Sequence, residues 1–166
     1  MLTIISSTNR KGSYTLKLSK LYKIELDNLN IKNQIFDLKL LPQNFIFKNL
    51  SDKTKEFDNI ISEYIEKSEK FIIVSPEYHG SYPGILKSFI DCIGNENLKY
   101  KKIGLVGVST GRLGNARGLD HLTILFNHLK ANVFYYKPKF SLIDKILEKN
   151  EIKKRVKDHI DEFMKF

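Results

Sequence analysis

The stretch with the greatest density of reactive side chains runs from Ser75 to Asp91, with the sequence SPEYHGSYPGILKSFID. It follows a short apolar segment, Phe71–Val74, and is expected to lead directly into a helix. Its prolines and glycines fix an unusual backbone path, while the polar and aromatic residues between them offer hydrogen-bonding and stacking groups. Open α/β sheets bind ligands at the loops that follow parallel strands. This stretch therefore predicts a ligand-binding loop.

A second loop with binding chemistry, Ser6–Thr15, has the sequence SSTNRKGSYT and lies before the first expected helix. It combines several hydroxyl groups with Gly12 and Arg10. Free backbone N–H groups and the positive end of the following helix suit a phosphate. The structural alternative is a polar loop that only caps the helix, because Ser and Thr are common at helix starts. It is not a nucleotide P-loop, since no Gly-Lys-Ser/Thr follows at the required spacing.

A third loop, Ser109–Leu122, has the sequence STGRLGNARGLDHL and follows the apolar segment Lys102–Val108. Its three glycines leave the backbone free to approach a ligand closely or to adopt a positive φ. Three of the four arginines of the chain, Arg10, Arg112 and Arg117, lie in these glycine-bearing loops. The planar guanidinium group suits phosphate and carboxylate partners, so the loops are expected to bind anionic groups.

Hydrophobic periodicity predicts strands and helices that alternate along the chain and position these loops. Strands are expected at Leu2–Ser6, Gln34–Leu38, Phe71–Val74, Lys102–Val108 and Asn132–Tyr136. Helices are expected at Thr15–Leu26, Lys53–Lys67, Pro83–Ile93, Leu119–Leu129 and Glu151–Phe166. Near-continuous apolar strands between helices indicate an α/β fold, a parallel sheet with helices on both faces. We expect residues 1–166 to form one domain. Periodicity alone does not give the strand order.

The run Ser75–Asp91 resembles the PEYNGSxPGxLKxxID signature of the NAD(P)H-dependent FMN reductase family, the flavodoxin-like group that includes quinone, azo and chromate reductases. The matching residues are Pro76, Glu77, Tyr78, Gly80, Pro83, Gly84, Leu86, Lys87 and Asp91. His79 stands where that family often has Asn. The resemblance implies a flavodoxin-like, doubly wound, five-stranded parallel sheet of order 2-1-3-4-5, with FMN at the switch point between the first and third strands.

The resemblance also implies which residues bind FMN. By the family's G-S-x-x-R-x-x-S-x-T pattern, the first loop would hold the phosphate with Arg10 as charge partner, although Ser6 replaces the opening Gly. Tyr78 would lie against the flavin ring, and backbone groups of Pro76–Gly80 would meet its pyrimidine edge. The implied FMN-binding residues are Ser7, Thr8, Arg10, Ser13, Tyr14, Thr15, Pro76, Glu77, Tyr78, His79, Gly80, Ser109, Thr110 and Gly111.

Four further residues have roles that the sequence leaves open. Arg112 and Arg117 would bind either the phosphate of a nicotinamide nucleotide or an acidic group across a subunit interface. Lys87 and Asp91 are four residues apart on a helix, so they would pair with each other or with a second subunit. No catalytic side chain is named, because the flavin carries the redox step. No metal site is expected, because His121 and His128 have no suitably spaced co-ligands.

The resemblance implies an FMN-dependent NAD(P)H oxidoreductase with ping-pong kinetics. NADPH or NADH would reduce bound FMN, and a small acceptor such as a quinone, an azo compound or a nitroaromatic would then take the electrons. Two alternatives remain open: a flavodoxin-type electron carrier without its own NAD(P)H turnover, and a flavin-free regulatory or binding protein on the same fold. Flavodoxin-type electron carriers tend to be acidic, whereas this chain has a formal net charge of +9.

Composition narrows the remaining classes of partner and compartment. Nucleic-acid binding is not expected, because the lysines are scattered rather than clustered. No membrane interaction is expected, since no apolar run approaches roughly 18 residues, and the opening residues do not resemble an export signal. A single cysteine, Cys92, agrees with a reducing compartment. We therefore expect a cytoplasmic protein, and the resemblance suggests a homodimer or homotetramer.

Overall fold

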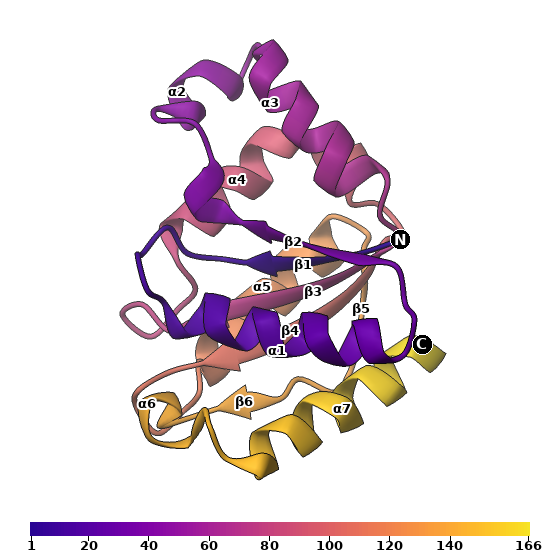
Figure 1. The fold of residues 1–166 in the computed structure, drawn as a ribbon. Helices are drawn as coiled ribbons and strands as arrows, with labels where there is room; N and C mark the ends of the chain where they lie inside the picture. The colour runs from indigo at the N-terminus through magenta and orange to yellow at the C-terminus, as the bar shows by residue number, and fades with distance from the viewer.

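A computed structural model describes all residues, 1–166, and contains one parallel sheet between layers of helices (Figure 1). The strands are β1 (Leu2–Ser6), β2 (Asn33–Asp37), β3 (Lys70–Pro76), β4 (Lys102–Val108), β5 (Asn132–Val133) and β6 (Lys139–Phe140). Their order, β2-β1-β3-β4-β5, confirms the predicted order. All strand pairs are parallel. Nearly every residue of β1, β3 and β4 is buried, as expected for strands covered on both faces.

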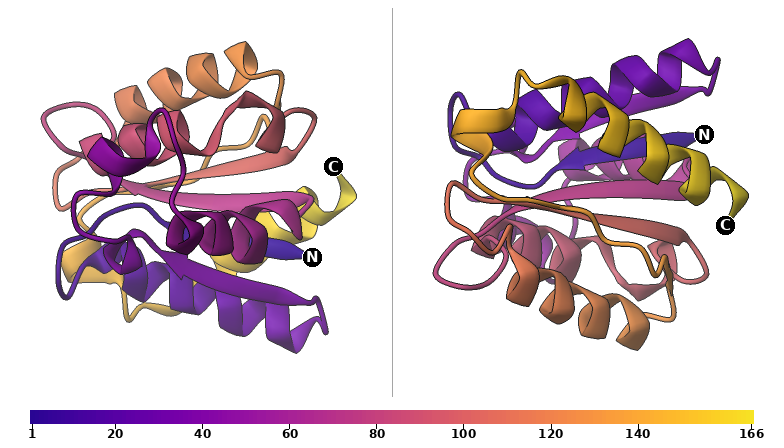
Figure 2. Two further views of the ribbon diagram at one scale, coloured as in Figure 1. Left: turned by 90° about the horizontal axis from the view of Figure 1, so that it is seen from above. Right: turned by 90° about the horizontal axis from the view of Figure 1, so that it is seen from below.

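Helices cover both faces of the sheet, with α1 and α7 on one side and α4 and α5 on the other (Figure 2). The longer helical elements are α1 (Tyr14–Asn28), α3 (Lys55–Ile60), η2 (Ile61–Glu66), α4 (Gly84–Ile93), α5 (Ala116–His128) and α7 (Asn150–Lys165). The short ones are η1 (Leu38–Leu40), α2 (Phe45–Asn49), η3 (Asn95–Asn97) and α6 (Ile143–Ile146). Each face buries its own apolar cluster, of 21 residues under α3, η2, α4 and α5 and of 16 under α1 and α7.

The fifth strand differs from the expected Asn132–Tyr136. The chain pairs with β4 at β5, leaves the ladder after the Phe134 N–H donates to the Ile103 carbonyl (2.8 Å), and pairs with β4 again at β6. Pro138 has no N–H to donate, so it cannot continue a regular ladder. An apolar run such as Asn132–Tyr136 does not reveal where an edge strand is interrupted.

Two helices also differ from the sequence-based expectation. The helix expected at Lys53–Lys67 divides into α3 and the π-helix η2, where the Gln34 side-chain amide donates to the carbonyl of Glu63 (2.9 Å). A side chain that inserts into the hydrogen-bond ladder of a helix disturbs its regular geometry. The helix α5 begins at Ala116, before the expected Leu119. The sequence did not reveal its first turn, because that turn has no apolar periodicity. The short helices α2 and α6 were not predicted for the same reason.

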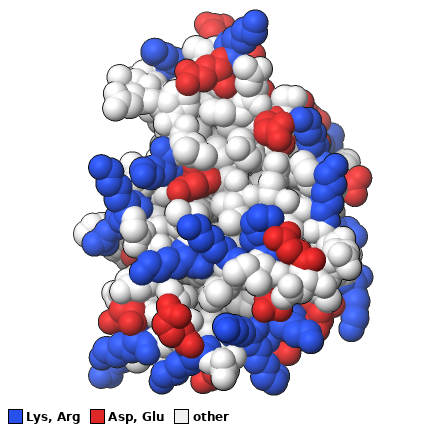
Figure 3. Space-filling view, viewed as in Figure 1, with Lys and Arg blue, Asp and Glu red and all other residues white.

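Some of the lysine side chains donate hydrogen bonds to backbone carbonyls at the C-terminal ends of helices. Lys70 donates to the carbonyls of Phe163 and Met164 in the last turn of α7, and Lys102 donates to the Phe166 carbonyl just after α7. Lys101 donates to the Ser68 carbonyl just after η2 (2.6 Å). Cations near helix C-termini are favoured because they satisfy free carbonyls and oppose the helix dipole. On the face in Figure 3, Lys and Arg are interspersed with Asp and Glu. None of the helices combines the length and the apolar character that a membrane span requires.

Candidate functional site

The loops after β1, β3 and β4 meet beyond the carboxyl ends of these strands and enclose a cavity of about 310 Å³, here called the first cavity. Its lining residues are Thr8, Arg10, Lys11, Gly12, Ser13, Tyr14, Thr15, Pro76, Glu77, Tyr78, Val108, Ser109, Thr110 and Ile143. All three loops selected from the sequence therefore contribute to one site. This follows from the strand order, which places β3 between β1 and β4.

The first loop provides the polar wall of this cavity. The Ser13 hydroxyl caps α1 by accepting from the Leu16 N–H (3.2 Å), and Gly12 has a φ of +65°. Ser7 does not line the cavity: it is fully buried, and both its N–H (3.1 Å) and its hydroxyl (2.8 Å) donate to the Val74 carbonyl. The structure thus uses Ser7 to join β1 to β3. The wall instead includes Lys11 and Gly12, which the pattern did not select.

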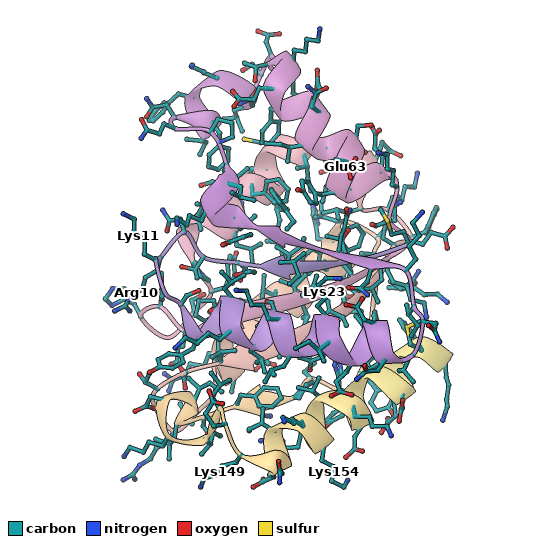
Figure 4. All side chains as sticks on the ribbon, in the orientation of Figure 1. Arg10, Lys11, Lys23, Glu63, Lys149 and Lys154 are labelled. Atoms are coloured by element: carbon teal, nitrogen blue, oxygen red, sulfur yellow. The ribbon has the colours of Figure 1, made fainter.

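Positive charge gathers at the mouth of the first cavity. Arg10 and Lys11 are exposed and project from the loop beyond the ends of the strands (Figure 4). Neither residue takes part in any of the ion pairs of the structure. Glu77 is the one carboxylate among the lining residues. The mouth therefore has a net attraction for anions.

The second loop forms a tight hairpin beside the cavity. Tyr78 and Ser81 exchange two backbone hydrogen bonds (2.8 and 3.0 Å), and His79 and Gly80 between them both have positive φ (51° and 74°). Positive φ at both central positions defines a type I′ turn, for which Asn-Gly is the favoured pair. His is among the residues that tolerate this conformation. The turn presents Tyr78 to the cavity, where its hydroxyl shares a hydrogen bond with the Thr8 hydroxyl (2.7 Å).

We expect Tyr78→Phe to lower the free energy of unfolding by about 1 kcal/mol, because it removes the hydrogen bond that joins the first two loops. Urea denaturation of both proteins measures this difference. The matched control is Tyr135→Phe, which removes a hydroxyl that donates to Glu162 (2.6 Å) on the exposed surface. Equal effects of the two substitutions would contradict the role of Tyr78 as a tie between loops.

The third loop packs directly on β4. The Ser109 hydroxyl donates to the Gly111 carbonyl (2.9 Å) and accepts from the Gly114 N–H (3.0 Å), so it holds the loop closed. A side chain at Gly107 would overlap the carbonyl oxygen of Gly114. The absence of a Cβ at Gly107 therefore allows the loop to approach the strand. Ser109 and Thr110 line the first cavity as expected, but Gly111 does not.

A second cavity of about 400 Å³ adjoins the first. It is lined by Glu77, His79, Gly80, Ser109, Thr110, Gly111, Arg112 and Leu113. Glu77, Ser109 and Thr110 line both cavities, so the two share a wall. Arg112 lines the second cavity, whereas Arg117 lines neither and lies against the hairpin, with its Nη1 3.7 Å from the position of a Cβ on Gly80. The two arginines, for which the sequence predicts the same roles, therefore occupy different places relative to the second cavity.

The remaining pair, Lys87 and Asp91, lies away from both cavities on α4. Their side chains form an ion pair with an N–O distance of 2.7 Å and are both substantially exposed. They border a groove between α4 and α5 whose apolar part includes Ile124 and Leu129. Within the chain, these two residues therefore pair with each other.

Besides Lys11 and Gly12, Ile143 and Asn115 contribute to the site and were not selected from the sequence. Ile143 at the start of α6 lines the first cavity, and no periodic pattern marks so short a helix. Asn115 lies behind the wall that the cavities share, and its N–H donates to Glu77 Oε2 (3.2 Å). Asn115 stands within the glycine-rich third loop, so its position in that motif was the available signal.

Comparison with known proteins gives four consistent similarities. The profile of the NADPH-dependent FMN reductase family matches residues 1–137, which include all three loops. The FMN-dependent NADPH-azoreductase of Staphylococcus saprophyticus is 31% identical over 130 residues, covering 76% of this chain and 69% of the relative. A crystal structure of an apo NADH:FMN oxidoreductase has a TM-score of 0.78 at 16% identity, over 98% of this chain and 87% of that one. A flavodoxin from the domain Archaea has a TM-score of 0.67 at 12% identity, over 99% of both chains.

Proposed function

This chain belongs to the NADPH-dependent FMN reductase family. On that premise we propose that it binds FMN in the first cavity. It then transfers electrons from NADPH or NADH to a small acceptor that binds in the second cavity. The observation that carries the proposal is the convergence of three loops, which follow strands far apart in sequence, on the first cavity. Two of these loops also line the second cavity, which shares a wall with the first.

The residues of the first cavity fit the parts of FMN. Hydroxyl groups, the N-terminus of α1 and Arg10 surround one end, which suits a phosphate because free N–H groups and positive charge meet there. Pro76 and Tyr78 line the cavity from the loop after β3, and their ring side chains suit contact with an aromatic ring. We assign the phosphate to the first group and the isoalloxazine to the second.

In this proposal FMN supplies the hydride chemistry when it is bound, and the chain supplies binding and orientation. Arg10 and the first loop hold the phosphate, and Tyr78, which is hydrogen-bonded to Thr8, holds the ring edge. The carboxylate of Glu77 keeps one orientation because it accepts from the Asn115 N–H. The second cavity receives the nucleotide and the acceptor in turn, which produces ping-pong kinetics.

The electron-carrier and flavin-free alternatives are tested on the purified protein. We expect a yellow protein, or one that becomes yellow with added FMN, whose flavin band is bleached anaerobically by NADPH or NADH and restored by an azo compound or a quinone. A flavin that neither nucleotide reduces would support an electron carrier. Failure to bind FMN would support a flavin-free protein. Light scattering would show whether the protein is the proposed homodimer or homotetramer.

We expect Arg112→Gln to raise the Michaelis constant for NADPH by up to about fivefold, because an exposed charge contact contributes up to roughly 1 kcal/mol. Arg117→Gln is the matched control and should leave this constant nearly unchanged, since Arg117 lines neither cavity. FMN affinity should be parental in both. Steady-state kinetics and light scattering together are the measurement. A change in oligomer mass for either variant would assign that arginine to a subunit interface instead.

A further inference from the structure

Asn115 is a fully buried polar residue of the third loop, immediately before the first residue of α5. Its backbone has a φ of +65°, in the left-handed region that favours glycine. Its side chain makes contact with the end of β3 rather than with its own loop. The backbone conformation alone does not explain why an asparagine stands here.

The amide of Asn115 is surrounded by acceptors from two consecutive residues. Its Nδ2 lies 3.1 Å from the Ser75 carbonyl oxygen, 3.2 Å from Ser75 Oγ and 3.0 Å from the Pro76 carbonyl oxygen. Its backbone N–H donates to Glu77 Oε2 at 3.2 Å. Thus one residue holds three successive residues, Ser75, Pro76 and Glu77, in fixed positions.

The opposite side of the amide is tightly enclosed. A side chain at Gly118 of α5 would overlap Asn115 Oδ1. The absence of a Cβ at Gly118 therefore leaves the space that the Asn115 amide fills. Oδ1 is buried without a hydrogen-bond partner, which carries a free-energy penalty. Glycine would satisfy the positive φ without that penalty. The reason for asparagine therefore lies in the hydrogen bonds that it donates to the end of β3.

The residues that Asn115 holds form the boundary between the two cavities. Pro76 and Glu77 line the first cavity, and Glu77 also lines the second. We propose that Asn115 is a positioning residue that fixes this shared wall, so that one buried amide sets the ring side of the FMN site and the adjoining acceptor site together. The inference rests on the proposed FMN function and concerns the ring rather than the phosphate.

This role predicts a specific pattern of ligand affinities. Asn115→Gly keeps the backbone conformation and removes the amide, and Gly118→Ala keeps the amide and displaces it. Both should raise the dissociation constant of FMN about tenfold, equivalent to about 1.4 kcal/mol. Riboflavin should lose the same factor, because the wall contacts the ring that both ligands carry. Asn30→Gly is the matched control, since Asn30 is exposed and also has a positive φ (55°).

The experiment measures FMN and riboflavin dissociation constants by quenching of flavin fluorescence, with thermal melting to show that each variant is folded at the titration temperature. Parental affinity for both ligands in either folded variant would overturn the inference. A loss confined to FMN would also overturn it, because only the phosphate side would then have changed. Lack of FMN binding by the parent protein would overturn the proposed function and this inference with it.

Discussion

Replacing Arg10 with alanine is expected to weaken FMN binding about 10- to 100-fold while riboflavin binding stays near the parental value. Arg10 lines the mouth of the first cavity and has no ion-pair partner in the chain, so its charge is free to meet a phosphate. A hydrogen bond to a charged group contributes roughly 1.5–3 kcal/mol, which corresponds to about one to two decades in affinity. Riboflavin lacks the phosphate and loses nothing.

The comparison of the two ligands is made by fluorescence titration of each protein. Lys20→Ala is the control, because Lys20 is an exposed cation of α1 outside both cavities. It should leave both affinities at the parental value. Equal losses for FMN and riboflavin would show that Arg10 does not meet the phosphate. A large loss in Lys11→Ala without one in Arg10→Ala would assign that contact to the neighbouring lysine.

Lowering the pH from 7 to 4 is expected to reduce the free energy of unfolding by about 3 kcal/mol through His159 alone. His159 on α7 is fully buried and shares a hydrogen bond with the Tyr22 hydroxyl on α1 (3.0 Å). Burial lowers the pKa of His159 to about 4, although the backbone of Tyr136 acts in the opposite direction. In the unfolded chain the pKa returns to its ordinary value of about 6.5.

The sign follows from which state binds the proton first. Between pH 6.5 and pH 4 the unfolded chain takes up a proton at His159 that the folded protein does not, so acid favours unfolding. The contribution is fully present above about pH 6.5 and is lost progressively as the pH falls toward 4. Because His159 joins α7 to α1, its protonation should loosen the docking of α7.

Urea denaturation at several pH values measures this effect as the difference between the parent protein and His159→Gln. The exposed His128 provides the control, since His128→Gln should keep the parental pH dependence. If the His159 variant does not fold, NMR titration of the parent protein measures the pKa of His159 in the folded state directly. A His159 ring signal that titrates near pH 6.5 in the folded protein would contradict the prediction.

Much of the architecture could be predicted from the sequence because its signals are local. Continuous apolar runs at Leu2–Ser6 and Lys102–Val108 mark buried parallel strands, and the structure has strands with those bounds. The three loops were selected for their glycines, hydroxyls and arginines, and all three reach one site. The strand order came from the family resemblance of Ser75–Asp91, because periodicity carries no information on order.

The tertiary structure decided how individual side chains of those loops are used. Ser7 faces Val74 in the core although its neighbour Thr8 faces the cavity, and Arg112 lines a cavity that Arg117 does not reach. Ile143 enters the site from a segment with no local pattern. These outcomes depend on contacts between residues far apart in sequence. Composition and spacing determine which loop can bind, but the packing of the strands and helices behind that loop determines where each side chain points.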